Sequence, residues 1–166
     1  MNPVADCRCT GERHCRGFTI IEVLVTLVIV GILASAVIPM AELARQRSRE
    51  QDLRDALRTV RRAIDAYKQA VDEGHIVRKA GESGYPHTLE DLVDGVPDAK
   101  DPKGGKLRFL RKLPVDPLID DAKEARVWGK RSYVSSHQEP LEGNDVYDVY
   151  SRATGAGLNG IPYREW

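Results

Sequence analysis

The sequence has no cysteine after residue 15, because Cys7, Cys9 and Cys15 all lie near its start. Without its first seventeen residues, the chain would form no disulfide and would need no particular redox compartment. Together with His14 the three cysteines suggest a metal cluster as an alternative. Their spacing fits no common zinc motif, however, and no second pair of ligands follows. We therefore interpret the cysteines as residues of an N-terminal leader.

A charge bias is also missing, since 25 Lys and Arg residues balance 25 Asp and Glu residues. The chain thus has neither the basic field of a nucleic-acid-binding protein nor the acidic bias of a disordered one. The four histidines are scattered, and no serine or later cysteine stands in a nucleophile motif. We predict that the chain is not an enzyme. The alternative, a signal-anchored enzyme, would show hydrolytic activity in the fragment from Ala41 onward.

The sequence does contain one long apolar run, which lies near the N-terminus. Between Phe18 and Ile38 there are 21 residues, of which only Glu22 is ionisable. As a helix this run would be roughly 31 Å long, which matches the hydrocarbon core of a bilayer. A buried core helix is the alternative, but the rest of this small chain has too few large apolar residues to surround one. The run therefore predicts a transmembrane helix.

The residues around Gly17 indicate how this helix begins. An ordinary secretory signal is cut after its apolar stretch, whereas here the small residue precedes it, so the helix should be retained. The run around Gly17 reads Arg16-Gly17-Phe18-Thr19-Ile20-Ile21-Glu22-Val23-Leu24-Val25. It resembles the class III signal of the type IV pilin and pseudopilin superfamily. The resemblance implies cleavage after Gly17 by a prepilin peptidase and N-methylation of Phe18. Glu22 and Pro39 then stand at positions typical of the family.

Glu22 is an ionisable group about one turn into the predicted membrane helix. A charged carboxylate at the centre of a membrane helix costs about 2.5–3.5 kcal/mol or more, unless it is paired or neutralised. The amine that cleavage creates on Phe18 of a neighbouring subunit would supply a partner and would select the correct register of assembly. The positive end of the subunit's own helix dipole is the alternative explanation. We favour the role between subunits and assign Glu22 to filament assembly.

Pro39 and Gly74 mark the boundaries of the next segment. Pro39 lacks a backbone donor and predicts a kink or local melting of the helix. No further Gly or Pro occurs before Gly74, which closes the helix. We therefore divide the chain into a cleaved leader (1–17), the transmembrane half of the helix (18–39), its amphipathic half (40–73) and a globular α+β domain (74–166).

The amphipathic half carries an apolar stripe with alternating steps of four and three residues, formed by Leu53, Leu57, Val60, Ile64, Tyr67 and Val71. A coiled-coil seam is one explanation, but fewer than three heptads are present. We predict instead that the stripe packs against the chain's own sheet. The other faces carry arginines, namely Arg47, Arg54, Arg58, Arg61 and Arg62. Because no aromatic residues alternate with them, we interpret them as a solvated face rather than a nucleic-acid site.

The elements predicted after Gly74 are short. Thr88 and Asp91 read as a capping box for a helix that ends near Gly95. Three runs are typical of β-strands, at 107–113, 131–135 and 146–151. A long helix followed by short strands predicts an α+β fold in which a small antiparallel sheet packs on the helix, as in pilins.

The globular part also resembles the major pseudopilins of type II secretion. Four motifs stand in the family's order: Tyr85-Pro86, Leu113-Pro114-Val115-Asp116-Pro117, Trp128-Gly129 and the strand from Tyr147 to Ser151. This chain departs from the family by inserting residues 118–127 between the Asp-Pro and Trp-Gly steps.

The same resemblance implies calcium binding in a C-terminal loop. Calcium takes about six to eight oxygen ligands, yet after Ser151 the chain offers only Glu165 as a carboxylate. Asp145 and Asp148 are the nearest candidates before it. We interpret these two as exposed strand and turn residues, and we assign no metal ligand and no cofactor.

For function, the resemblance implies a structural subunit of a type II secretion pseudopilus, a filament that drives protein export. The implied partners are the prepilin peptidase, an inner-membrane platform protein, a secretion ATPase, other pseudopilins and further copies of the chain, with no nucleic acid. Arginines flank the membrane helix on both sides, so the positive-inside rule leaves its orientation open. The resemblance alone implies a single-pass inner-membrane protein with its globular domain in the periplasm. A type IV pilin or minor pilin for adhesion, motility or DNA uptake is the alternative function.

Overall fold

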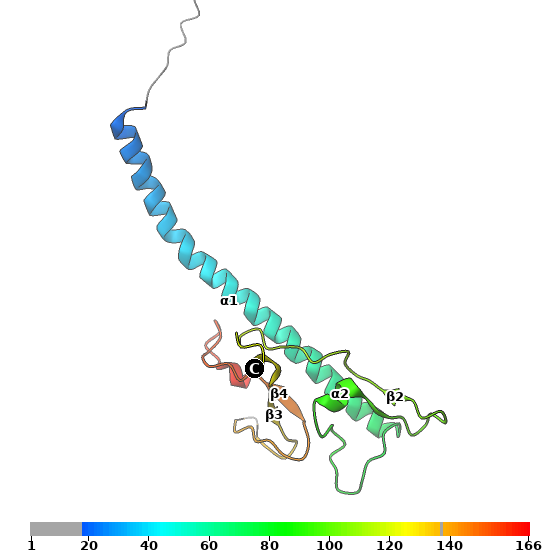
Figure 1. Cartoon of the computed structure of the whole chain (residues 1–166). Helices are drawn as coiled ribbons and strands as arrows, with labels where there is room; N and C mark the ends of the chain where they lie inside the picture. The colour runs from blue at the N-terminus through cyan, green and yellow to red at the C-terminus, as the bar shows by residue number, and fades with distance from the viewer. Residues whose placement is uncertain (1–17, 137) are drawn as a thin grey trace, which may run out of the picture. The chain divides into compact units, whose positions relative to one another are not determined.

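The computed structural model describes residues 18–136 and 138–166 (Figure 1). A helix of 53 residues, α1 (Ile20–Asp72), comes first. It is followed by α2 (Glu90–Asp94), β1 (Val96–Pro97), β2 (Lys106–Leu107), the 3-10 helix η1 (Glu124–Arg126), β3 (Gly129–Arg131), β4 (Asp148–Tyr150) and the 3-10 helix η2 (Tyr163–Glu165). The chain divides into two units, one ending at Glu42 and one spanning Leu43–Trp166. All elements after α1 belong to the second unit.

The C-terminal end of α1 is a Schellman motif centred on Gly74. Gly74 has a φ of 78°, which a residue without a Cβ adopts at little cost. Its amide donates to the carbonyl oxygen of Val71 at 3.0 Å, and the amide of His75 donates to that of Ala70 at 2.8 Å. These are the two hydrogen bonds that define the motif, so the prediction that Gly74 closes the helix is confirmed. At Pro39, where the sequence predicts a kink or local melting, α1 continues as a helix and does not melt. The kink there stays a prediction.

The predicted capping box of α2 is also confirmed. The backbone amide of Thr88 donates to Asp91 Oδ2 at 2.9 Å, and the amide of Asp91 donates to Thr88 Oγ1 at 3.3 Å. The helix ends at Gly95, whose φ is 80° and whose amide donates to the carbonyl oxygen of Asp91. This short helix therefore satisfies several of its terminal backbone groups by local sequence alone.

The strand predicted at 107–113 is wrong beyond its first residue. β2 pairs antiparallel with β1, a strand that the sequence pattern missed, with Val96 opposite Leu107. After Leu107 the amides of Phe109 and Leu110 both donate to the carbonyl oxygen of Leu92 at 2.9 Å. Because the end of α2 takes these donors, no further ladder forms along the segment.

The strand predicted at 131–135 is wrong beyond Arg131, because β3 spans the residues before it, whereas the strand predicted at 146–151 is correctly placed but too long. β3 and β4 pair antiparallel, with Gly129 opposite Tyr150 and Arg131 opposite Asp148. Beyond β3 the chain turns, because the amide of Ser135 donates back to the carbonyl oxygen of Ser132. Within the described residues the strands form two two-stranded sheets instead of a single sheet. The α+β class with a long N-terminal helix and small antiparallel sheets is confirmed.

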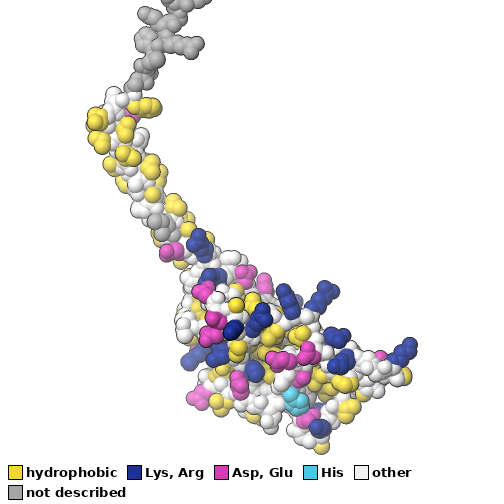
Figure 2. Space-filling model, viewed as in Figure 1, with side chains coloured by type: hydrophobic (Ala, Val, Ile, Leu, Met, Phe, Trp, Pro, Cys, Tyr) yellow, Lys and Arg dark blue, Asp and Glu magenta, His cyan; other side chains and the backbone are white. Residues whose placement is uncertain are grey.

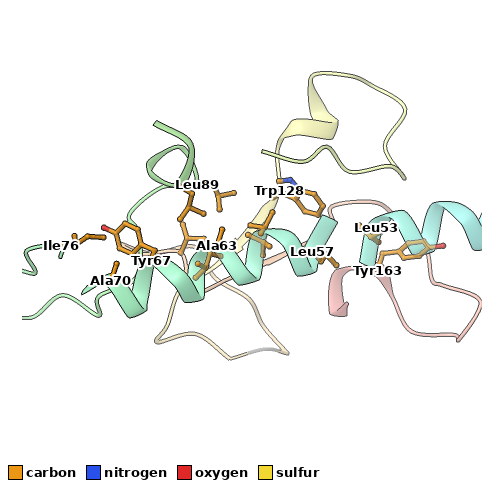
Figure 3. Close-up of a cluster of buried hydrophobic side chains, with 14 residues drawn as sticks. Leu53, Leu57, Ala63, Tyr67, Ala70, Ile76, Leu89, Trp128 and Tyr163 are labelled. Carbon is orange, nitrogen blue, oxygen red and sulfur yellow. The ribbon is translucent and has the colours of Figure 1, made fainter. Parts of the chain in front are cut away.

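One hydrophobic core lies between the second half of α1 and the elements that follow (Figure 3). Five of the six predicted stripe residues are buried in it and the sixth, Val71, is partly buried; Ala63 and Ala70 widen the stripe. The rest of the chain contributes Ile76, Leu89, Leu92, Trp128, Val146, Val149 and Tyr163. The stripe therefore packs on its own domain, as the sequence analysis predicted.

Candidate assembly site and its supporting fold

The first part of α1 is apolar and exposed. Every large apolar side chain described from Phe18 to Leu43 is exposed, from 82% at Phe18 to 45% at Val23. Figure 2 shows hydrophobic side chains along the N-terminal part of the helix, whereas Lys, Arg, Asp and Glu side chains are scattered over the visible face of the rest. It is the one helix of the described residues that is long and apolar enough to cross a membrane. A surface of this size demands a lipid or protein environment.

Thr19 caps the N-terminus of α1. The side-chain oxygen of Thr19 accepts a hydrogen bond from the amide of Glu22 at 3.3 Å. The carbonyl oxygen of Thr19 accepts from the amides of Glu22 and Val23 at 3.1 and 3.2 Å. Glu22 is thereby fixed in the first turn with its side chain exposed. The cap orients Glu22 at the positive end of the helix dipole, where a carboxylate is favoured.

The other predicted site residues are those of leader processing, Gly17 and Phe18, and that of the helix kink, Pro39. Phe18 comes directly before the Thr19 cap, so its backbone nitrogen lies near the start of the helix. Its side chain is 82% exposed. Pro39 lies inside α1. Gly17 and the leader cysteines fall outside the described residues.

The two hydroxyl side chains of the apolar segment beyond the Thr19 cap form hydrogen bonds with the backbone of the helix itself. Thr26 Oγ1 donates to the carbonyl oxygen of Val23 at 2.9 Å, and Ser35 Oγ donates to that of Ile32 at 2.7 Å. Hydroxyls bonded in this way cost little in an apolar medium. Along the helix the first basic residue is Arg45, roughly 34 Å of helical rise beyond Glu22. A cationic partner for Glu22 from the downstream part of its own helix is therefore out of reach.

The interpretation of the arginines as a solvated face is only partly right. Arg47, Arg58 and Arg62 are exposed. Arg61 is different, since its Nε donates to Asp148 Oδ1 at 2.7 Å and its Nη2 donates to the carbonyl oxygen of Val149 at 3.1 Å. The guanidinium of Arg54 lies 4.4 Å from the ring centroid of Trp166. These two residues flank the buried stripe and tie the second half of α1 to the end of the chain.

The Pro-rich, Trp-Gly and Tyr-rich motifs, far apart in the sequence, meet in one place. Trp128 Nε1 donates to the carbonyl oxygen of Pro114 at 2.9 Å. Ser151 Oγ donates to Asp116 Oδ2 at 2.5 Å, and both residues are buried. A Cβ on Gly129 would collide with the ring of Tyr150, so this step needs glycine. The motifs therefore form one structural unit that supports the domain.

The two aspartates considered for calcium do not fit such a site. Asp148 accepts from Arg61 and Arg131 through its two carboxylate oxygens, and from the amide of Val149. Asp145 accepts from the hydroxyls of Ser83 and Ser132 and from the amide of Tyr133. The expectation that the two are exposed is wrong, because both are half-buried. Among residues 18–136 and 138–166, no cluster of three or more metal-binding side chains occurs.

Burial and hydrogen bonding act in opposite directions on Asp145. Desolvation raises the pKa of its carboxyl, but the hydrogen bonds from Ser132, Ser83 and the amide of Tyr133 outweigh it. The pKa of Asp145 is therefore below its ordinary value of 3.8. The carboxylate acts as a bridge between the 83–85 segment and the turn after β3.

Glu50 is the functional side chain that the sequence analysis missed. It is 3% exposed, and its Oε1 accepts hydrogen bonds from Gln46 Nε2, the amide of Leu158 and the hydroxyl of Tyr163. Desolvation and the neighbouring Glu50 raise the pKa of Tyr163 above its ordinary value, although the hydrogen bond from Gln46 lowers it. Glu50 lies three residues before Leu53, so extending the stripe backward by one step would have placed it on the buried face.

Comparisons with known proteins indicate the family of the chain. A family profile described as the prokaryotic N-terminal methylation motif matches residues 13–38. The type II secretion system core protein G of Klebsiella pneumoniae is 34% identical over 113 residues, which cover 64% of this chain and 71% of that protein. The protein of the same name from Pseudomonas aeruginosa is 33% identical and 70% covered, and that from Escherichia coli K12 is 32% identical and 68% covered.

The chain belongs to the type II secretion system core protein G family. No solved structure matches it closely enough to add a comparison of coordinates. Within this core protein G fold, the methylation motif spans the cap at Thr19, Glu22 and most of the exposed apolar helix. The second unit supplies the packed domain.

Proposed function

We propose that the chain is a structural subunit of a type II secretion pseudopilus. The observation that carries the proposal is the exposed apolar first part of α1, which bears the methylation motif in a chain of the core protein G family. Such a surface is stable in lipid before assembly and against the helices of neighbouring subunits afterwards. The role is mechanical rather than catalytic.

The inner membrane is the proposed location before assembly. Residues 18–39 match the thickness of the hydrocarbon core, and their hydroxyls are already satisfied. In the proposed orientation the leader is cytoplasmic and the Leu43–Trp166 unit is periplasmic. The proposed partners are the prepilin peptidase, an inner-membrane platform protein, a secretion ATPase and other pseudopilins.

Glu22 is the residue proposed to set the register between subunits. The Thr19 cap fixes Glu22 in the first turn of α1, where an unpaired charge in lipid is costly. Cleavage after Gly17 would give each subunit a new amine on Phe18. An axial offset between neighbouring helices would then place the amine of one subunit against Glu22 of the next, and only the correct offset pairs both charges.

Mass spectrometry of the chain purified from membranes tests the processing on which this function depends. We expect the mature chain to begin at N-methylated Phe18 and to lack all three cysteines. A Gly17→Ile variant should keep its leader when it is produced with the same prepilin peptidase. A mature wild-type chain that begins elsewhere, or that retains Cys7 to Cys15, would contradict the proposal.

A further inference from the structure

We propose that Glu50 and Arg61 hold the C-terminal segment, residues 155–166, on α1 without a metal ion. The family resemblance of the sequence implies calcium in a C-terminal loop, whereas the described residues do not fit such a site. The fixed conformation of the segment therefore needs another source. Two side chains of α1 supply it, one acidic and one basic, and the segment closes the remaining hydrogen bonds within itself.

Glu50 holds the middle of the segment. Its buried Oε1 accepts from the amide of Leu158 at 2.9 Å and from the hydroxyl of Tyr163 at 3.1 Å. Gln46, one turn earlier on α1, donates to the same oxygen at 3.1 Å and to the Tyr163 hydroxyl at 3.3 Å. A buried carboxylate is stable only when such donors surround it. The carboxylate and the segment consequently depend on each other.

Arg61 holds the end of the segment. Its Nη2 donates to the backbone oxygen of Trp166 at 2.6 Å, while its Nε donates to Asp148 at 2.7 Å. The indole of Trp166 contacts the guanidinium of Arg54, at 4.4 Å, and the ring of Tyr163, at 5.2 Å between centroids and nearly edge-on. Arg61 therefore joins three parts of the fold: α1, β4 and the last residue.

Three oxygen atoms of the segment that a cation could use already accept hydrogen bonds inside it. The carbonyl oxygen of Ile161 accepts from the amide of Gly157 at 2.9 Å and from Trp166 Nε1 at 3.1 Å. The carbonyl oxygen of Gly157 accepts from the amide of Gly160, and Asn159 Oδ1 accepts from the amide of Ile161 at 3.0 Å. Calcium recruits carbonyl and carboxylate oxygens of this kind, so its entry would break bonds that the segment already makes.

Hydrogen exchange of the full chain in detergent micelles tests the proposal. Exchange of the 155–166 amides is measured with excess EGTA and with millimolar calcium, and we expect equal rates. Glu50→Ala and Arg61→Ala should each speed exchange across 155–166 by roughly tenfold, because each removes charge-assisted hydrogen bonds to this segment. Glu50→Gln and Arg61→Lys should have smaller effects, since they keep part of the hydrogen bonding.

Asp52→Ala and Arg62→Ala are the matched controls, because both side chains are exposed on the same helix. Amides of α1 between residues 53 and 67 report whether a variant has lost its whole fold instead of the segment alone. Slower exchange of the wild-type segment in calcium would overturn the proposal, and so would unchanged exchange in both alanine variants. Neither readout requires filament assembly, so the result is independent of the proposed function.

Discussion

The hydroxyl of Ser151 donates a hydrogen bond of 2.5 Å to the carboxylate of Asp116, and both residues are buried. The other carboxylate oxygen of Asp116 accepts from the amide of Leu118 at 2.9 Å. This pair joins the end of the β3–β4 sheet to the Pro-rich segment. It links two motifs separated by some thirty residues of sequence.

Ser151→Ala is expected to destabilise the protein by about 1–3 kcal/mol, because it leaves one oxygen of a buried carboxylate without its donor. Chemical denaturation followed by tryptophan fluorescence measures the loss, since Trp128 lies in the same unit. Thr154→Ala, three residues on and exposed, serves as the control and should change little. Equal stabilities of the two variants would contradict the role of the pair.

Ile64→Ala tests the packing of the stripe on its own domain. Ile64 is 0% exposed, so the substitution should lower the free energy of unfolding by about 2–5 kcal/mol through lost burial and a cavity. Arg62→Ala, on an exposed face of the same helix, should stay near wild type. A stripe that served another chain instead would leave the unfolding of the single subunit unaffected by Ile64→Ala.

Gly129→Ala tests the close approach of β3 to β4. The new methyl group would overlap the ring of Tyr150, and overpacking of this kind typically costs about 1–3 kcal/mol. We expect a lower midpoint of thermal unfolding and faster exchange of the β4 amides. Lys130→Ala, next along the same strand, provides the comparison; an equally small shift in both variants would show that the ring moves aside freely.

The lowered pKa of Asp145 predicts part of the loss of stability in acid. Its carboxyl has a pKa below the ordinary value of 3.8 in the folded protein, so the folded state binds this proton less readily than the unfolded state. The resulting stabilisation is complete above pH 3.8 and is lost as the pH falls from there through the folded pKa. Asp145→Asn should therefore flatten the decline of stability below about pH 4.

Urea midpoints measured over a pH series give this slope directly. Asp65→Asn, which changes an exposed carboxylate on α1, should leave the slope as it is in the wild-type protein. If Asp145→Asn also kept the wild-type dependence of stability on pH, the hydrogen bonds from Ser83 and Ser132 would not hold the carboxylate in its charged form.

Features set by neighbours in the sequence were predictable. The stripe follows from helical spacing, the α2 cap from Thr88 and Asp91, and the end of α1 from Gly74. The strand lengths were not, because the amides of Phe109 and Leu110 bond to Leu92 in place of a ladder. A strand pattern indicates which residues fit a sheet. It does not indicate which distant carbonyl oxygen accepts the hydrogen bonds of their backbone amides.

The roles of Glu50 and Arg61 escaped prediction for a related reason. Their partners, Leu158 and Trp166, lie more than one hundred residues away in the sequence. Helical spacing extends the stripe to Glu50, but a charged residue is usually solvated, and only the fold shows the partners that Glu50 and Arg61 bind. The aspartates at 145 and 148 were likewise expected at the surface, because their donors come from distant segments.

We propose that this core protein G relative assembles through its N-terminal helix, with Glu22 paired to the amine of a neighbouring Phe18. The most direct measurement compares Glu22→Ala with wild type in cells that carry the cognate secretion genes. It quantifies the mature chain in the membrane fraction and in filaments sheared from the cells. Glu42→Ala, which removes an exposed carboxylate farther along α1, is the matched control.

We predict wild-type amounts of processed Glu22→Ala chain in the membrane. Its yield in filaments should fall by at least roughly tenfold, as expected from the loss of a charge pair formed in an apolar environment. Glu42→Ala should assemble normally. An unchanged filament yield for Glu22→Ala, with normal membrane insertion and processing, would contradict the claim.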